Sequence, residues 1–520
     1  MRTPYRSRSI LDECLLSSFK GSAKYIRARR LLQAMKSDDP LLVAWQTTLS
    51  RKGNRAAVLD PNGKIVRSFR DIEERARAFE AKINALSSGA VVAVQIGNHE
   101  DWPSVFIACL RKQLVVLPLD QSTSDQQREA AMKICGASAV VSAVFSGHSP
   151  EIVRLKTPKD RDQAADAIAD WGQNAPALLK LTSGTTAAPR AIRFRSDQVL
   201  ADCNQICETM GISDADLNFG VISIPHSYGF SNLLTPLIAR GVPNVVSRDR
   251  TPRAVLADLG STGATIFPGT PVFYQAFCDM DDVPPLPKLR LCISAGAPLA
   301  GGVARKFFEK FKQPIHSFYG ASECGGICYD RDGTTFEDGL VGQPMEGVAI
   351  ELVNPTASAS QISVRSEAVS DGYFPEPDEE KLGNGIFIPD DLLTRHNSAL
   401  KIVGRVSDVI NIAGKKVNPA EIEAHLLRFE GVRQAVVFGC PTGAGLRNEE
   451  VAACVIASPQ VTQNDLLRFC RAALSPWQVP KRILIVDALP INERGKISRR
   501  ELARRFSKRG ETSPLRRLGS

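Results

Sequence analysis

A chain of 520 residues is longer than a single hydrophobic core usually serves, so we expect more than one domain. Apolar residues make up 43% and charged residues 23%, an ordinary balance for a folded protein that excludes wholesale disorder. Much of the net charge of +9 lies in the two ends, MRTPYRSR and RRFSKRGETSPLRRLGS, which we interpret as solvated tails rather than as nucleic-acid-binding segments.

The cysteines and the apolar runs indicate the cellular compartment of the protein. The twelve cysteines form no CxxC pair and no Cys/His cluster with metal-ligand spacing, so buried thiols in a reducing compartment account for them. The longest apolar run, 105–119, is interrupted by Arg111 and Lys112 and cannot span a bilayer. The N-terminus lacks the apolar stretch of a signal peptide. We therefore expect a cytoplasmic protein without a membrane segment or a nucleic-acid partner.

In chain order, residues 1–50 form a basic lead-in without evident chemistry. Two strand-like runs around Pro61-Asn62-Gly63 predict a hairpin. Short apolar runs then alternate with helical patterns, which predicts an α/β architecture with a buried, largely parallel sheet. The predicted strands in this region are 90–97, 113–119, 138–145, 220–225 and 289–295.

A hydroxyl-rich loop, LTSGTTAAPR (181–190), lies between two predicted strands, 177–181 and 191–194. Its hydroxyls and the amides around Gly184 can surround a phosphate, and Arg190 can add a bidentate guanidinium. The loop is not a Walker A loop, and by itself it is equally consistent with a Ser/Thr-rich surface turn. A helix follows, with one apolar face formed by Val199, Leu200, Cys203, Ile206, Cys207 and Met210.

Later stretches carry further groups suited to a nucleotide. FYGASE (318–323) combines a ring that can stack on a base with Glu323, which can hold a hard cation. SAGAPL (294–299) is a small-residue turn that can pass close to a flat ring. PDDL (389–392) follows, and LPINERGKISRREL (489–502) presents a lysine in an exposed turn.

Near residue 405 the sequence pattern changes. Asn418 as a cap, Pro419 at the first helical position and Glu421 placed for a capping box predict a helix. Strands at 435–438 and 450–457 and a helix at 465–474 complete an α+β unit of roughly 100 residues. The predicted division is a lead-in at 1–50, a large domain at 51–404, a small domain at 405–505 and a tail at 506–520.

In this order, the motifs resemble those of the adenylate-forming superfamily, which includes acyl-CoA and aryl-CoA synthetases, peptide-synthetase adenylation domains and beetle luciferases. The resemblance runs from about residue 50 to 505 through six motifs in the same order. It implies a large N-terminal domain of stacked α/β sheets plus a distorted barrel, and a small mobile α+β C-terminal domain. It also implies an AMP-forming acid–thiol ligase, which converts a carboxylic acid and ATP into an acyl-adenylate and transfers the acyl group to CoA.

The resemblance implies nucleotide-binding roles for most of the motifs. The hydroxyl-rich loop would surround the β- and γ-phosphates, and Ser322 would contact the α-phosphate. Tyr319 would lie on the adenine, which the turn at 296–298 would flank, and Asp391 would bind the ribose hydroxyls. The implied nucleotide-binding residues are Thr182, Ser183, Gly184, Thr185, Thr186, Arg190, Gly296, Ala297, Pro298, Tyr319, Gly320, Ser322 and Asp391.

The resemblance implies catalytic roles for three charged residues. Glu323 would bind Mg²⁺, Arg405 would contact the ribose and phosphate, and Lys496 would bridge the carboxylate and the α-phosphate. Because a carboxylate attacks a phosphate in this reaction, two negative groups must meet, and the transition state needs cations rather than an acid–base pair.

Other implied roles concern the acid and the thiol. HSYG (226–229) resembles the HxxG segment, so His226, Tyr228 and Gly229 would border the acyl pocket; a histidine on an apolar segment is also consistent with a core position. Ser407 occupies the hinge about which the small domain would swing between the two steps, and Gly414 would lie on its thiolation face.

The sequence also departs from the family pattern. Ala187 stands where the family has glycine, and Ser407 stands where aspartate or lysine is usual. PDD (389–391) replaces TGD one residue closer to the following arginine, so Asp390 is a rival of Asp391 for the ribose role.

Other functions fit the sequence less well or stay open beside this one. A serine hydrolase and a zinc protease are disfavoured because neither GxSxG nor HExxH occurs. Amino-acid adenylation is the runner-up within the family, but IPHSYGFSN (224–232) carries no carboxylate for a substrate ammonium, which favours a fatty, aromatic or other plain acid. A ligase that loads a carrier protein and a catalytically degenerate nucleotide-binding member stay open.

Overall fold

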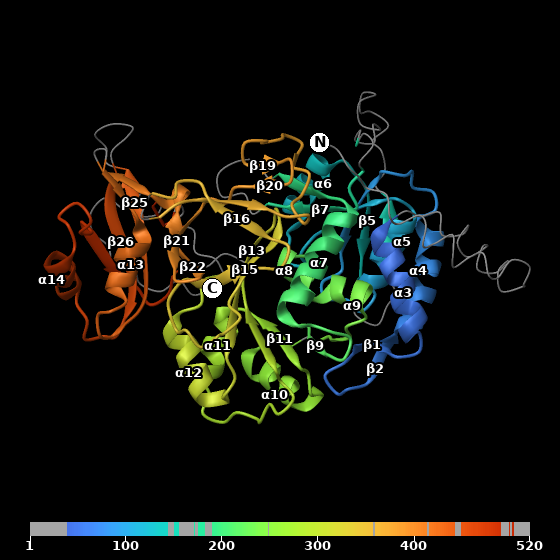
Figure 1. Cartoon of the computed structure of the whole chain (residues 1–520), viewed down its shortest axis with the longest axis horizontal. Helices are drawn as coiled ribbons and strands as arrows, with labels where there is room; N and C mark the ends of the chain where they lie inside the picture. The colour runs from blue at the N-terminus through green and yellow to red at the C-terminus, as the bar shows by residue number, and fades with distance from the viewer. Residues whose placement is uncertain are drawn as a thin grey trace, which may run out of the picture.

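The computed structural model of the chain describes residues 39–143, 150–154, 171, 175–182, 190–247, 249–356, 359–412, 415–441, 449–489, 499 and 502–503. The elements up to β22 form a large body, and the elements after β22, coloured orange to red, form a smaller body beside it (Figure 1). Some predicted site residues lie outside the described residues: Ser183, Gly184, Thr185, Thr186, Gly414 and Lys496.

The largest sheet is parallel in its central part and antiparallel towards both edges. The parallel part runs from β1 to β13, and every later neighbour is antiparallel. Its strand order is β2 (Ile65–Ser68), β1 (Ala56–Leu59), β10 (Asn244–Val245), β9 (Asn218–Phe219), β11 (Ile266–Gly269), β12 (Leu291–Ser294), β13 (Ile315–Ala321), β14 (Gly325–Tyr329), β15 (Leu340–Pro344), β22 (Ala399–Arg405) and β21 (Asp391–His396).

A second sheet carries the hydroxyl-rich loop. Strands β7 and β8 are antiparallel neighbours, so the loop connects two adjacent strands, as the sequence predicts. Strands β7, β4, β3 and β5 are parallel, and β4, β3 and most of β7 are buried, which fits their continuous apolar runs. The order is β18 (Tyr373–Phe374), β8 (Ala191–Phe194), β7 (Leu178–Leu181), β4 (Val115–Pro118), β3 (Val91–Gln95), β5 (Ala137–Ser142) and β6 (Glu151–Arg154).

Helices cover these sheets. The predicted helix with one apolar face is α7, which buries Val199, Cys203, Ile206, Cys207 and Met210. Helix α3 crosses the predicted limit of the lead-in at residue 50 and buries Trp45. The remaining described helices of the large domain are α4 (Phe69–Ile83), α5 (Trp102–Arg111), α6 (Asp125–Cys135), α8 (Ser227–Gly229), the π-helix η2 (Phe230–Leu234), α9 (Thr235–Arg240), α10 (Pro252–Thr262), α11 (Pro271–Cys278) and α12 (Gly301–Phe311), beside α3 (Pro40–Lys52) and α7 (Ser196–Met210).

The prediction of a strand at 220–225 is wrong. Strand β9 ends at Phe219, and the following backbone is irregular. The Asn98 side chain donates to the Gly220 and Ile222 carbonyls at 3.3 and 2.8 Å and accepts from the Ile224 amide at 2.9 Å. These backbone groups therefore pair with a side chain rather than with a neighbouring strand.

The small domain has its own core around Ile422, Val437 and Leu466. Asn418 caps α13 through the Ala420 amide, as predicted, but the capping box is wrong: the Glu421 carboxylate accepts from Gln478 instead. The elements after the large sheet are the 3-10 helix η3 (Val406–Asp408), β23 (Ile410–Ile412), β24 (Lys415–Val417), α13 (Pro419–Leu426), β25 (Val432–Pro441), β26 (Glu449–Ala457), α14 (Gln463–Ala473) and β27 (Arg482–Ile485).

A four-stranded antiparallel sheet completes the large domain, in the order β16 (Ala349–Leu352), β17 (Ile362–Arg365), β20 (Ile386–Phe387) and β19 (Leu382–Gly383). None of the helices within the described ranges is both long and apolar enough to cross a membrane.

Candidate active site

The predicted site residues gather at the carboxyl ends of the parallel strands β11, β12 and β13, where open α/β sheets bind their ligands. The turn at 296–298 follows β12 and is exposed, and the YGASE motif forms the end of β13 and the turn after it. Gly296 has a φ of +87°, a backbone conformation that favours glycine.

Tyr319, Asp391 and Arg405 form one hydrogen-bonded group. The Tyr319 hydroxyl donates to Asp391 Oδ2 at 2.7 Å, and Arg405 Nε donates to Asp391 Oδ1 at 2.7 Å. Asp391 and Arg405 face each other because β21 and β22 pair in that register. Burial raises the pKa of Tyr319 well above its usual range, so the phenol stays neutral. The rival Asp390 points elsewhere and pairs with Lys381 at 2.8 Å.

Glu323 lies beside Tyr373, a residue that sequence reasoning missed. The Tyr373 hydroxyl donates to Glu323 Oε1 at 3.0 Å, and among the described residues no other side chain is hydrogen-bonded to this carboxylate. Burial raises the pKa of Glu323, while the Tyr373 hydrogen bond opposes this rise. A single half-buried carboxylate with one oxygen available fits a hard cation that takes its other ligands from phosphates and water.

Arg190 stands at the end of the hydroxyl-rich loop. The Thr182 amide donates to the Arg190 carbonyl at 2.8 Å, so these residues close the two ends of the loop. The Arg190 guanidinium lies over the Tyr373 ring at 4.3 Å, and Nη1 is 3.8 Å from Asp378 Oδ2. Tyr373 therefore contacts both Arg190 and Glu323. Tyr373 of β18 pairs with Ile192 of β8. Because these residues are far apart in the sequence, no local pattern indicates that Tyr373 lies at the site.

His226 is held by Asp120, which sequence reasoning also missed. His226 Nε2 lies 3.2 Å from Asp120 Oδ2, and the Ser223 hydroxyl donates to the same oxygen at 2.6 Å. Ser122 donates to Asp120 Oδ1. These hydrogen bonds hold the pKa of Asp120 well below its usual range despite partial burial, and the bond from His226 has the largest effect. Asp120 follows the parallel strand β4, and this position at a carboxyl end is a signal that could have identified it.

Helix α8 brings the HSYG segment against the YGASE motif. The Ser227 hydroxyl donates to Ser322 Oγ at 3.0 Å. A Cβ at Gly229 would lie 2.0 Å from the Ser223 carbonyl oxygen, so only glycine fits there. Ser227 therefore lies directly beside Ser322, for which the resemblance implies a contact with the α-phosphate.

The predicted hinge residue Ser407 lies in η3. Its neighbour Asp408 accepts a hydrogen bond from Arg499 Nη1 at 2.6 Å, and Arg499 Nη2 donates to Glu423 Oε1 at 2.8 Å. The segment after β22 is thereby tied to the small domain.

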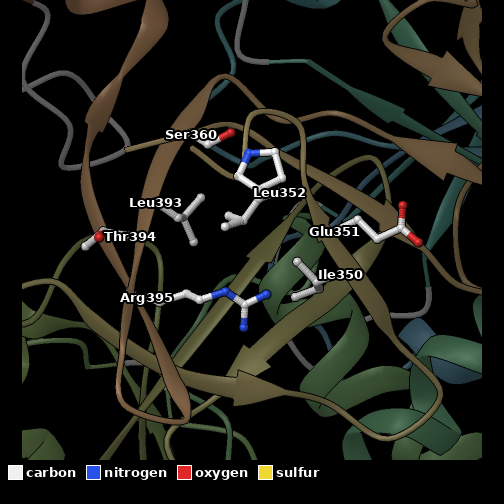
Figure 2. A pocket seen from close by; sticks show the side chains of 8 residues that line it. Ile350, Glu351, Leu352, Ser360, Leu393, Thr394 and Arg395 are labelled. Atoms are coloured by element: carbon white, nitrogen blue, oxygen red, sulfur yellow. The ribbon is translucent and has the colours of Figure 1, made fainter. Parts of the chain in front are cut away.

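An open pocket of about 500 Å³ lies elsewhere, between β16 and β21. Figure 2 shows Ile350, Leu352 and Leu393 around the hollow and the Arg395 guanidinium beside Ile350. None of its lining residues belongs to the predicted site, so we place the candidate active site at the strand ends and not in this pocket.

The fold is that of an α/β protein with a large domain, in which the candidate site lies at the ends of a parallel sheet, and a smaller domain beside it. A family model described as AMP-binding enzyme matches residues 45–374, and a model of the AMP-binding enzyme C-terminal domain matches residues 421–496. The first match covers more than half of the chain. The chain belongs to the AMP-binding enzyme family.

Its relatives include CoA ligases. The chain is 26% identical to a probable CoA ligase of Humulus lupulus, over 84% of this chain and 90% of that protein. It is 26% identical to the oxalate–CoA ligase of Arabidopsis thaliana, over 84% of this chain and 92% of that protein. These likenesses confirm the predicted enzyme class, an AMP-forming acid–thiol ligase.

Solved structures confirm the fold class. ATP-bound MatB from Rhodopseudomonas palustris matches with a TM-score of 0.77 at 20% identity, over 89% of this chain and 98% of that chain. The o-succinylbenzoate CoA synthetase of Bacillus subtilis, in complex with its acyl-adenylate, matches with a TM-score of 0.75 at 18% identity, over 91% and 99%. The large N-terminal domain and the smaller C-terminal domain are as predicted; the movement of the small domain stays a prediction.

Proposed function

We propose that the protein binds Mg-ATP, joins AMP to a plain carboxylic acid with release of pyrophosphate, and transfers the acyl group to the CoA thiol with release of AMP. The observation that carries the proposal is the hydrogen-bonded group of Tyr319, Asp391 and Arg405 at the end of β13. A buried carboxylate held by a phenol and a guanidinium presents a fixed polar edge suited to ribose hydroxyls, and the flat Tyr319 ring beside it suits a base.

The phosphates would occupy the adjoining loop. Thr182 and Arg190 close this loop, and its hydroxyls and amides, with those of Ser183, Gly184, Thr185 and Thr186, would hold the β- and γ-phosphates. Ser322 would contact the α-phosphate. The adenine would lie along Tyr319 and Gly320 beside the turn formed by Gly296, Ala297 and Pro298.

Adenylation brings a carboxylate against a phosphate, so the site must supply positive charge. Lys496 would bridge the two groups, and Arg405 would contact the ribose and phosphate. Glu323 would hold Mg²⁺, which supplies charge stabilisation between phosphate oxygens when bound. Tyr373 donates to one Glu323 oxygen, and the other oxygen would be the ligand of the cation.

The acid would lie beside helix α8, bordered by His226, Tyr228 and Gly229. The Asp120 carboxylate near this helix is already occupied by His226, Ser223 and Ser122, so it offers no free partner for a substrate ammonium. This arrangement favours a plain carboxylic acid over an amino acid. Rotation about Ser407 would then withdraw Lys496 and present the Gly414 face to the thiol.

Exchange of labelled pyrophosphate into ATP, tested with fatty, aryl and amino acids, measures adenylation directly. We expect exchange with plain acids only, and a loss of about a hundredfold or more in Lys496→Ala, because one preorganised charge is worth about 3–4 kcal/mol. Lys481→Ala, an exposed lysine of the same domain, is the matched control. Tight Mg-ATP binding without exchange would indicate a degenerate nucleotide binder, and no ATP binding would overturn the proposal.

The thiol acceptor needs a second assay. Acyl-CoA formation with free CoA is expected at a rate comparable to adenylation. Acyl-adenylate that accumulates in the presence of CoA, and is consumed only by a pantetheinylated carrier protein, would replace CoA by a carrier in the proposal.

A further inference from the structure

Lys180 is a buried lysine in β7, immediately before the hydroxyl-rich loop (181–190). Only 7% of it is exposed, and its ammonium lies 4.4 Å from the centroid of the Phe194 ring. Because side chains alternate along a strand, Lys180 shares a face of β7 with Leu178, which belongs to the large hydrophobic core that includes Val199 of α7. A lysine thus occupies the core side of the strand that leads into the loop, a position at which lysine is rare.

The charges that act on Lys180 come from two other segments. Burial lowers the pKa of Lys180, and the carboxylates of Asp202 in α7 and Glu323 in the YGASE motif oppose this shift. Cys324 lies nearby as well, but burial raises the pKa of its thiol well above the usual range, so it stays neutral. Among the described residues, no carboxylate forms an ion pair or a hydrogen bond with the ammonium. Its positive charge is therefore shared between two carboxylates.

Asp202 joins two segments of the candidate site. Its Oδ1 accepts a hydrogen bond from the Gly326 amide at 3.0 Å, and its Oδ2 accepts from the Ser231 hydroxyl at 2.5 Å. Ser231 lies in η2, which continues helix α8, and Gly326 lies in β14, directly after the YGASE turn. Gly325 has a φ of +71°, and a Cβ there would lie 2.0 Å from Asp202 Oδ1, so only glycine fits.

The Asp202 carboxylate adds a second negative charge beside Glu323. The phosphates of Mg-ATP would add more, and like charges repel strongly where the surrounding dielectric is low. A buried positive charge next to the loop offsets this repulsion. Among the described residues, the buried lysines are Lys52 and Lys180, and Lys52 pairs with Asp214 at 3.3 Å. Lys180 is therefore the buried lysine that serves the site.

We propose, on the basis of the proposed function, that Lys180 is a positioning residue for Mg-ATP: its ammonium offsets the negative charges of Asp202 and Glu323, so that the phosphates can occupy the loop that follows β7. Lys180 acts through these two carboxylates and makes no contact with the acid. Removal of its charge should therefore weaken ATP binding and leave the KM for the acid unchanged.

Calorimetric titration of the whole chain with Mg-ATP, in the absence of any acid, tests the inference. Lys180→Met removes the charge and keeps most of the side-chain length, and we expect the Kd for ATP to rise by about tenfold. Asp202→Asn removes one negative charge, while its amide can still accept from Gly326 and donate to Ser231. The double variant has the same local net charge as the wild type, so it should recover most of the lost affinity. A lysine that only fills space would give no such recovery.

Lys52→Met is the matched control, because Lys52 is 8% exposed and its partner Asp214 lies outside the candidate site. It should lower the melting temperature and leave the Kd for ATP unchanged. A wild-type Kd in Lys180→Met, no recovery in the double variant, or an equal loss in Lys52→Met would overturn the inference. If Lys180→Met does not fold, as judged by its melting temperature, Asp202→Asn is compared with the double variant. The double variant should then bind ATP about tenfold more weakly, and equal affinities would overturn the inference.

Pyrophosphate exchange separates this inference from the proposed function. In Lys180→Met the KM for ATP should rise while the KM for the acid stays at the wild-type value; a rise in both would overturn the inference. ATP binding that depends on Lys180, without exchange with any acid, would support the inference and refute acid activation. No ATP binding by the wild type would refute the proposed function itself.

Discussion

The Tyr319 hydroxyl donates a 2.7 Å hydrogen bond to Asp391, a residue on a different strand of the same sheet. The bond joins the end of β13 to the start of β21, and Arg405 binds the second oxygen of the same carboxylate. Three sequence motifs thereby become one rigid group at the edge of the sheet. The ring of Tyr319, the carboxylate of Asp391 and the guanidinium of Arg405 lie in one place because of these two hydrogen bonds.

Asp391→Asn should weaken ATP binding, because the amide cannot accept from both Tyr319 and Arg405 and leaves a buried donor unpaired. The expected loss of stability is about 1–3 kcal/mol, with a comparable loss in ATP affinity. Asp390→Asn is the matched control, since that carboxylate pairs with Lys381 at the surface. Calorimetric titration with ATP measures both variants. An Asp390→Asn protein that loses more affinity than Asp391→Asn would contradict the assignment.

Glu323→Gln should stabilise the fold while it removes Mg²⁺-dependent exchange. Burial raises the folded-state pKa of Glu323, so the folded protein favours the protonated acid, and stability from this group decreases as pH rises through the ordinary glutamate range of about 4.3 and above. The melting temperature of the variant should therefore exceed that of the wild type near pH 7, with a smaller difference near pH 4. Exposed Glu376→Gln should change neither quantity; a lower melting temperature for Glu323→Gln near pH 7 would refute the prediction.

Asp120→Asn should destabilise the protein in a pH-dependent manner. The hydrogen bonds from His226, Ser223 and Ser122 lower the folded-state pKa of Asp120, so its stabilising effect is present above the unfolded value of about 3.9 and is lost as pH falls below it. Urea unfolding near pH 7 should show a loss of about 1–3 kcal/mol that narrows under acid conditions. Exposed Asp125→Asn serves as the control. A loss that is constant with pH would show that the carboxylate charge is not responsible.

Arg499→Met should loosen the segment at 406–408. Arg499 joins Asp408 to Glu423 and to the Val437 carbonyl, so its removal leaves two half-buried carboxylates without their cation. We expect faster limited proteolysis near residue 407 and a loss of about 1–3 kcal/mol. Arg468→Met, which removes a largely exposed arginine of the same domain, should behave as the wild type. Equal cleavage rates for the two variants would count against a role for Arg499 at this segment.

Local patterns in the sequence predicted much of the fold. The apolar face of α7, the two strands on either side of the hydroxyl-rich loop and the Asn418 cap are confirmed, because each depends on residues close together in the chain. The predicted strand at 220–225 failed for the opposite reason. Three of its backbone groups pair with the Asn98 side chain, which is more than a hundred residues away in the chain, and no local pattern contains that partner.

The sequence by itself determined the class of chemistry, since loop hydroxyls, an aromatic–carboxylate motif and a terminal lysine have meaning through residue type and order. Only the tertiary structure decided which groups support them. Tyr373 reaches Glu323, Asp120 holds His226, and Asp202 joins the YGASE turn to η2. Hydrogen bonds and ring contacts act over a few ångströms. The distance in space between these paired residues is set by the order and register of the strands, which the amino-acid sequence does not state.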